Sequence, residues 1–114
     1  METIEKIDVE SGSLTVKEAV ATVEIELERA KFAGKNVLKI VHGYGSSGTG
    51  GEIKKAVFLL LKTLKKHKKI IDFCPCEKFG FTQKNYNFLI KKYPNLLIDD
   101  NIKNLNSGAT IVFL

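Results

Sequence analysis

The spacing of apolar and polar positions predicts a strand followed by a helix in the first third of the chain. Residues 4–9 alternate between apolar and polar side chains, as a half-buried strand does. Thr15 and Glu18 have the spacing of a capping box, so a helix should begin after Thr15. Apolar residues then recur every three to four positions until Gly34, a residue type that commonly ends a helix. A helix with one buried face is therefore expected over this segment.

The middle of the chain repeats this order. Residues 36–41 form a short apolar run rich in β-branched side chains, which is typical of a central strand covered on both faces. Thr49 and Glu52 form a second candidate capping box. The helix that follows has a buried stripe at helical spacing, made of Ile53, Ala56, Val57, Leu60, Leu61 and Leu64.

Shorter elements are predicted in the last part of the chain. Residues 69–74 are expected to form a strand that Pro75 ends, and residues 86–93 a short helix that Pro94 ends. We expect a loop over residues 99–107 and a last strand over residues 108–114. A chain of 114 residues with this order of elements should fold as a single α/β domain over residues 1–114.

Charge is unevenly distributed along the chain. The net charge is +5, yet residues 1–34 hold four basic and eight acidic side chains. Residues 35–114 therefore carry most of the positive charge, which is typical of a protein that offers one face to a polyanion. The alternative that remains open is that the lysines keep the protein soluble.

Composition also bears on location and on metal or redox chemistry. No apolar run approaches the ~18 residues of a membrane span, and the acidic amino terminus lacks the core of a signal peptide. A cytoplasmic protein with no membrane partner is expected. The spacing of Cys74 and Cys76 is too short for a C-x-x-C metal or dithiol motif, so both are expected to be reduced thiols.

The most informative segment lies between residues 37 and 57. An apolar strand leads to His42, then to a loop rich in glycine, and then directly to a basic helix. Glycine lets the backbone approach a ligand closely, and the free N–H groups at the start of a helix favour an anion. The segment therefore predicts a phosphate site with one imidazole beside it.

Standard nucleotide motifs do not account for this loop. Gly43, Gly45 and Gly48 satisfy G-x-G-x-x-G, but the chain lacks the second half that a dinucleotide fold needs. A Walker A loop is excluded because no G-K-[ST] sequence follows the glycines.

The loop and its surroundings resemble another family. His42-Gly43-Tyr44-Gly45, then Gly48-Thr49-Gly50 and the helix start at residues 52–57, resemble the H-G-x-G-[ST]-G…L-[RK] signature of the small MutS-related (Smr) domain. The sequence at residues 15–19 is similar to the family's T-x-x-E-A motif, and residues 108–114 are similar to its closing G-x-[TI]-x-V-x-L strand. The chain also departs from the family pattern. Glu10 stands where the family's L-D-x-H-G motif has its histidine, the glycine loop is a few residues longer than usual, and residues 79–106 form an insertion.

The resemblance implies a fold and a function. The fold would be a two-layer sandwich with the order βαβα-β-(helical insertion)-β, in which two helices pack on a four-stranded mixed sheet, similar to the carboxyl-terminal domain of translation initiation factor three. Smr domains bind nucleic acid, RNA or DNA, and several nick DNA or cleave RNA. An endonuclease that hydrolyses phosphodiester bonds is therefore one expectation.

Roles for single residues follow. His42 would be the acid or base, since an imidazole takes either role near neutrality. Asp8, at the end of a neighbouring strand, would orient His42, or Asp8 and Glu10 would hold a divalent metal ion, magnesium or manganese, through their carboxylate oxygens. The phosphate-binding groups would be Gly43, Tyr44, Gly45, Ser46, Ser47, Gly48, Thr49, Gly50, Lys54 and Lys55.

Other interpretations remain open from the sequence. His42 could simply hydrogen-bond and shape the glycine turn. The domain could then be a catalytically inactive module that binds nucleic acid, or a binder of small phosphates or nucleotides. Neither the preference between RNA and DNA nor the oligomeric state follows from the sequence.

Overall fold

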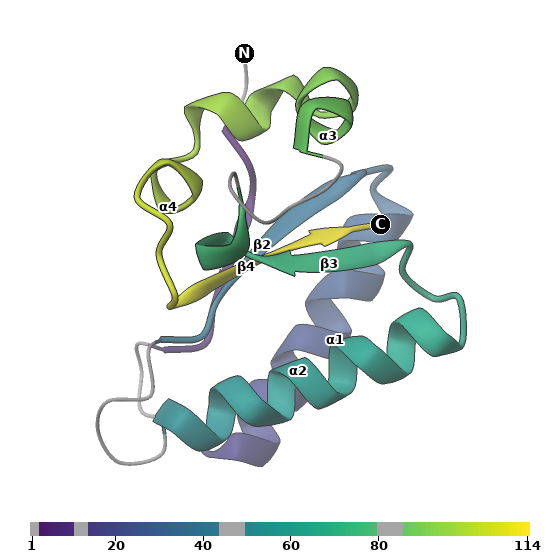
Figure 1. The fold of residues 1–114 in the computed structure, drawn as a ribbon. Helices are drawn as coiled ribbons and strands as arrows, with labels where there is room; N and C mark the ends of the chain where they lie inside the picture. Colours follow the sequence, from purple (N-terminus) through teal and green to yellow (C-terminus); the bar gives the residue numbers. More distant parts are fainter. Residues whose placement is uncertain (1–2, 11–13, 44–49, 80–85) are drawn as a thin grey trace.

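The fold is built around a four-stranded mixed sheet (Figure 1). The computed structural model describes residues 3–10, 14–43, 50–79 and 86–114. The strand order is β1-β2-β4-β3; β1 runs parallel to β2, and β4 runs antiparallel to both β2 and β3. The strands are β1 (Lys6–Asp8), β2 (Val37–Val41), β3 (Asp72–Pro75) and β4 (Ala109–Phe113).

Two long helices cover one face of this sheet, α1 (Val16–Phe32) and α2 (Gly50–Lys66) (Figure 1). The capping box at the start of α1 is confirmed: Glu18 N donates to Thr15 Oγ1 at 3.1 Å, and Thr15 N donates to Glu18 Oε1 at 2.9 Å. Apolar side chains of both helices and of the sheet form one buried cluster, which includes Val23, Leu27, Leu38, Ile40, Val57, Leu61 and Val112. The predicted mixed sheet with two main helices is confirmed.

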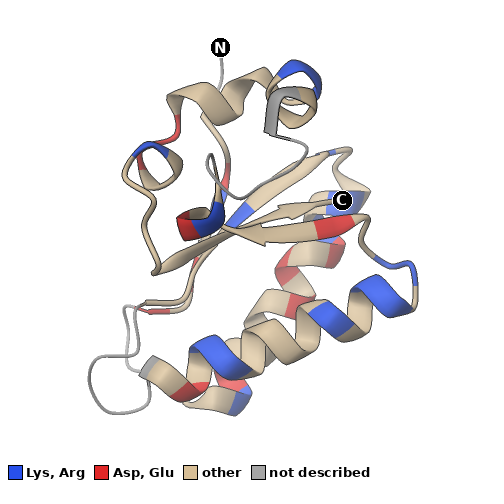
Figure 2. Ribbon diagram, in the orientation of Figure 1, with Lys and Arg blue, Asp and Glu red and all other residues tan. Residues whose placement is uncertain are grey.

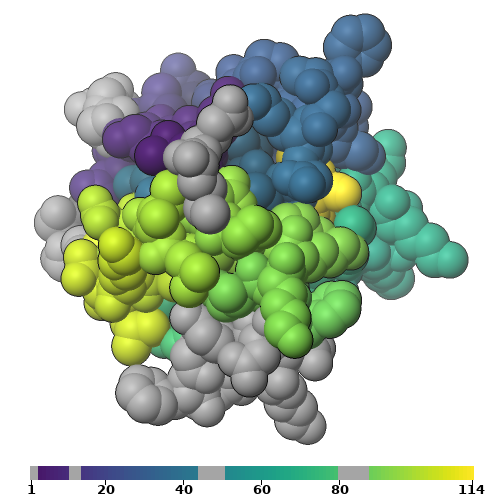
Figure 3. Space-filling view, turned by 90° about the horizontal axis from the view of Figure 1, so that it is seen from above, coloured from purple at the N-terminus to yellow at the C-terminus, as the bar shows by residue number. Residues whose placement is uncertain are grey.

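The insertion lies on the opposite face of the sheet (Figures 1 and 3). Its described residues contain the 3-10 helix η2 (Pro94–Ile98) and the short helices α3 (Tyr86–Lys92) and α4 (Asp100–Lys103), and the 3-10 helix η1 (Cys76–Lys78) directly precedes it. A second buried cluster joins these elements to the sheet, with Phe79, Tyr93, Leu96 and Ile102 packed near Ile111 and Phe113. The insertion therefore covers a sheet face that would otherwise be exposed to water.

Some predicted boundaries differ from the structure. The loop expected over residues 99–107 is wrong, because α4 begins there with Asp99 as its N-cap, whose carboxylate accepts from Ile102 N at 3.1 Å. Pro94 ends α3 as expected but also begins η2. The second capping box falls on Thr49, which lies outside the described residues. Within the part of the chain that the structure describes, no helix has the length and apolar character needed to span a bilayer.

Candidate functional site

The candidate site lies where β1 and β2 end side by side. These strands are parallel, with Asp8 paired in register with Val41, so their carboxyl ends meet at one edge of the sheet. His42 follows β2 directly, and α2 begins at Gly50. The predicted loop residues between them, Tyr44, Gly45, Ser46, Ser47, Gly48 and Thr49, lie outside the described residues. The described part of the site therefore consists of the strand ends, His42, Gly43 and the start of α2.

His42 is fully buried between the sheet and α2, with 0% of its surface exposed. Its Nδ1 lies 2.9 Å from the Gly43 carbonyl, which can only accept, so Nδ1 carries a proton. In the neutral ring Nε2 then accepts from the Thr110 hydroxyl at 2.8 Å. The ring also meets the edge of Phe58, with 5.5 Å between centroids. Both nitrogens of His42 are thus occupied by the protein.

The electrostatic surroundings keep this imidazole neutral. Burial is the main cause that lowers the pKa of His42 below its ordinary value. The hydrogen bond to Gly43 acts in the opposite direction, while the charges of Lys54 and Glu77 lower and raise the pKa respectively. A neutral, enclosed imidazole suits the shaping of the glycine turn. In this arrangement the ring is not exposed to a ligand, because it is fully buried and both of its nitrogens are hydrogen-bonded.

Gly43 and Gly108 fix the start of the loop. Gly43 has φ +84°, and an added Cβ would lie 2.9 Å from Glu10 Oε2. The backbone N–H groups of His42 and Gly43 both donate to the Gly108 carbonyl at 3.0 Å. A left-handed backbone with a close neighbour explains why glycine occupies position 43.

Asp8 and His42 are not brought together. Along β1 and β2 side chains alternate between faces; Ile7 and Ile40 lie in the cluster under α1 and α2, which places Asp8 on the other face. Asp8 Oδ1 accepts from Glu10 N at 2.9 Å. The predicted orientation of His42 by Asp8 is therefore not seen. Gly43 and Thr110 hold the ring instead.

Glu10 contacts the loop directly, since its side chain packs against Gly43. Asp8 and Glu10 are both exposed at the same sheet edge. Their carboxylate oxygens are ligands that magnesium accepts. Among the described residues, however, no group of three or more His, Cys, Asp or Glu side chains is placed to hold a metal ion. These two carboxylates alone are a partial ligand set.

Lys54 and Lys55 differ although they are neighbours in α2. Lys54 Nζ donates to the Ser107 carbonyl at 2.9 Å, lies 3.6 Å from Glu77 Oε1, and keeps 20% of its side chain exposed. It therefore ties α2 to η1 and to the segment before β4. Lys55 is exposed, and within the described residues no hydrogen bond or ion pair involves its side chain. Of the two lysines, Lys55 is the one presented to solvent.

Comparison with known proteins decides the family. The sequence profile of the Smr domain matches residues 12–79, more than half of the chain. The chain belongs to the Smr domain family. The match begins just after Asp8 and Glu10 and ends where the insertion begins, so the altered first motif and the insertion lie outside the matched residues or at their end.

A solved structure gives the same fold for this Smr domain. The crystal structure of the Smr domain of Thermus thermophilus MutS2 is similar, with a TM-score of 0.57 and 22% sequence identity over 97% of this chain and 98% of that chain. At this identity the likeness concerns the fold. A search among curated proteins found no match. Smr domains generally bind nucleic acid, and some members are nicking endonucleases.

Three residues that the sequence does not predict to belong to the site hold His42 and Lys54 in place. Thr110 bonds to His42, and the Ser107 carbonyl and Glu77 bond to Lys54. One signal was present for Thr110, because it is a hydroxyl residue in an otherwise apolar closing strand. No comparable signal marked Ser107, which contributes through its backbone carbonyl.

Proposed function

We propose that this Smr domain is a nucleic-acid-binding module that holds phosphate groups where β2 ends and α2 begins. One contrast supports binding over hydrolysis: Lys55 is exposed beside the loop, whereas His42 is fully buried with both ring nitrogens bonded. A cation near the start of a helix is unfavourable by itself, and an incoming phosphate would relieve the repulsion. The family's general affinity for nucleic acid agrees with this proposal.

Phosphodiester cleavage is the second candidate. The observation that favours it is the pair of exposed carboxylates of Asp8 and Glu10, of which Glu10 packs against Gly43. Magnesium is commonly bound by one or two carboxylates together with substrate phosphates, so these residues fit a divalent ion that binds with the nucleic acid. In this version Asp8 and Glu10 would hold the ion. His42 would contribute by fixing the loop unless the ring leaves its present contacts.

A titration with salt tests the binding proposal. End-labelled single-stranded RNA and duplex DNA would each be titrated with the protein between about 50 and 200 mM salt. A polyanion site should lose affinity steeply, and Lys55→Gln should weaken binding and reduce the slope of log K against log salt by about 0.7 to 0.9. Lys17→Gln, an exposed lysine on α1, is the matched control and should change neither. A shallow slope in every variant would point to a small-phosphate binder and contradict the proposal.

A cleavage assay separates the module from the nuclease. The same nucleic acids, and a supercoiled plasmid, would be incubated with magnesium, manganese or a chelator, using the unmodified protein, His42→Ala and Asp8→Asn. Bound but intact nucleic acid supports the module. Cleavage that Asp8→Asn abolishes while binding persists would establish the carboxylate site instead. Cleavage lost in a folded His42→Ala protein would show that the reaction depends on His42, either as acid or base or through the loop that it fixes, and circular dichroism shows whether that variant is folded.

A further inference from the structure

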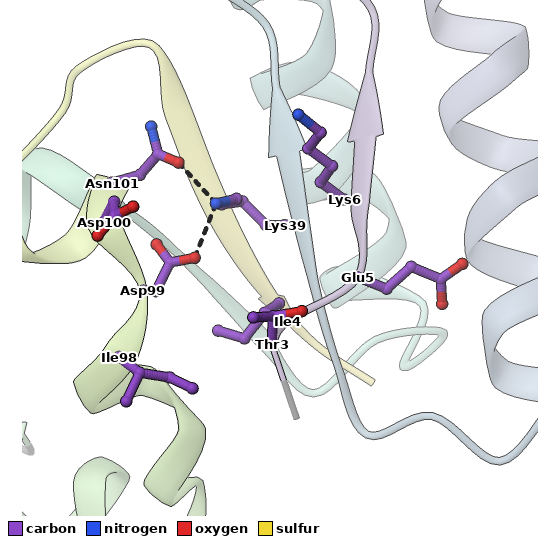
Figure 4. A pocket seen from close by; sticks show the side chains of 9 residues that line it. All are labelled: Thr3, Ile4, Glu5, Lys6, Lys39, Ile98, Asp99, Asp100 and Asn101. Atoms are coloured by element: carbon purple, nitrogen blue, oxygen red, sulfur yellow. Dashed lines mark hydrogen bonds and ion pairs between the residues drawn. The ribbon is translucent and has the colours of Figure 1, made fainter. Parts of the chain in front are cut away.

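A cavity lies on the sheet face that the insertion covers. It encloses about 500 Å³ between the amino-terminal part of the sheet and the segment that joins η2 to α4 (Figure 4). This volume is within the usual range of small-ligand sites, about 300 to 1,000 Å³. Its lining comprises Thr3, Ile4, Glu5, Lys6, Lys39, Ile98, Asp99, Asp100 and Asn101.

Lys39 is the unusual residue of this cavity, because it lies in the central strand β2 and only 10% of its side chain is exposed. Its Nζ donates to Asp99 Oδ1 at 2.7 Å and to Asn101 Oδ1 at 2.6 Å (Figure 4). An ammonium group has three N–H donors, so one remains for a ligand. Asn101 uses its oxygen for Lys39, which leaves its amide N–H groups as further donors. A fixed set of donors therefore borders the cavity.

The charges of the lining leave one group of each sign without an ionic partner. Asp99 is paired with Lys39, and Glu5 is paired with Arg29 of α1. Lys6 is the register partner of Lys39 on the neighbouring strand, so both side chains rise from the same face of the sheet. Lys6 and Asp100 are both exposed and take part in no ion pair among the described residues. The cavity therefore offers a cation on the strand side and a carboxylate on the α4 side.

We propose that this cavity binds a small organic acid that also carries N–H or O–H donors. Its carboxylate or phosphate group accepts hydrogen bonds from Lys6, Lys39 and the amide of Asn101. Its donor group meets Asp100, and Ile4 and Ile98 cover its apolar part. An amino acid and a nucleoside monophosphate share this chemistry. The proposal is independent of nucleic-acid binding at the glycine loop.

The test is a titration of the whole protein, labelled with nitrogen-15, followed by NMR. Leucine, adenosine monophosphate and inorganic phosphate would be added separately up to about 10 mM, above the ~1 mM dissociation constant of a weak site. We expect leucine or adenosine monophosphate to shift amide signals of residues 3–6, 39 and 98–101 in a saturable way. Which of the two does so identifies the ligand class. Phosphate alone should bind more weakly, because it lacks the group that faces Asp100.

Two variants and one control variant make the outcome decisive. Lys6→Gln changes an exposed side chain and should weaken binding at least tenfold, whereas Lys35→Gln, an exposed lysine elsewhere, should leave it unchanged. Asp100→Asn should weaken binding of the full ligand but not of phosphate. The proposal is overturned if no probe shifts these signals, if Lys6→Gln has no effect, or if the shifts instead map to Gly43 and the first turn of α2.

Discussion

At the scale of single residues, His42 acts as a bridge between strands. Its backbone follows β2, its Nε2 accepts from Thr110 of β4, and its ring packs against Phe58 of α2. A buried imidazole that is satisfied at both nitrogens stabilises the fold in its neutral form. Protonation would place a charge in the core and remove the acceptor that Thr110 uses.

The first prediction concerns pH. Because the folded-state pKa of His42 is lowered, the unfolded chain takes up a proton at this residue near pH 6.5 while the folded protein does not. Stability should therefore fall as the pH drops below about 6.5, by at most about 1.4 kcal/mol per pH unit from this residue. Urea unfolding at several pH values between about 5 and 7.5 measures this dependence.

The control for this measurement is His42→Gln, which cannot be protonated in this range. Its free energy of unfolding will be lower at neutral pH, but the difference between the two proteins should shrink as the pH falls. A difference that stays constant with pH would mean that His42 is protonated equally in the folded and unfolded states. That result would contradict a buried neutral imidazole.

Gly43 gives the second prediction. Gly43→Ala forces a left-handed backbone on alanine and brings its Cβ against Glu10, so a loss of about 1 to 2 kcal/mol is expected. Gly34 is a matched control, because it has φ +79° but no atom within 4 Å of an added Cβ. Gly43→Ala should therefore cost more than Gly34→Ala in urea unfolding. In a Glu10→Ala background the excess should disappear, and an unchanged excess would show that the contact with Glu10 is not its cause.

At the scale of elements, the sequence predicted those elements that depend on residues close together in the chain. The capping box of α1 and the buried stripes of both long helices depend on residues within a few positions of one another, and these helices are present. The insertion was harder because its elements are short and are held by distant partners. Asp99 reads as a loop residue in sequence, yet it caps α4 and binds Lys39, which is 60 positions away.

The candidate site shows the same division. The positions of His42 at the end of β2 and of the glycine loop before α2 follow from local patterns. The hydrogen bonds between Thr110 and His42 and between Lys54 and the Ser107 carbonyl form because β4 pairs with β2 and β3 in the sheet. Spacing along the chain does not encode these contacts, so the sequence assigned His42 and Lys54 to a ligand when the fold itself engages both.

The third prediction concerns the link between the insertion and the sheet. Asp99→Asn keeps the cap of α4 but removes the charge that pairs with the buried Lys39, so a loss of about 3 kcal/mol is expected. Asp72→Asn breaks the pair of Asp72 and Lys65, whose side chains are 48% and 52% exposed, and should cost less than about 1 kcal/mol. Thermal unfolding compares the two variants.

A double variant tests the reason for this loss. If the cost of Asp99→Asn comes from an unpaired buried ammonium, then adding Lys39→Met should recover part of the stability. If the double variant is instead less stable than Asp99→Asn, then the aliphatic part of Lys39 or its contact with Asn101 stabilises the folded protein.

At the scale of the whole molecule, the two long helices that share one face of the sheet differ in charge: α1 holds four acidic and three basic residues, whereas α2 holds one acidic and five basic residues. In Figure 2 red and blue positions are mixed along α1, while blue positions predominate along α2. The exposed Lys55, Lys62 and Lys66 lie on one side of α2 and extend from the loop towards the carboxyl end of the helix. A nucleic-acid strand bound at the loop should therefore follow α2 and avoid α1.

The last prediction separates this path from an effect of net charge. Replacing both Lys62 and Lys66 by Gln should reduce the slope of log K against log salt for single-stranded RNA by about 1.4, since each phosphate contact contributes about 0.7. Replacing Lys17 and Lys35, which are exposed outside α2, removes the same charge and should leave the slope unchanged. The expected difference arises because counterions are released only where lysines meet phosphates. Equal reductions in both double variants would show that the net charge attracts the strand without a defined path, and unchanged slopes in both would confine the contact to the loop and Lys55.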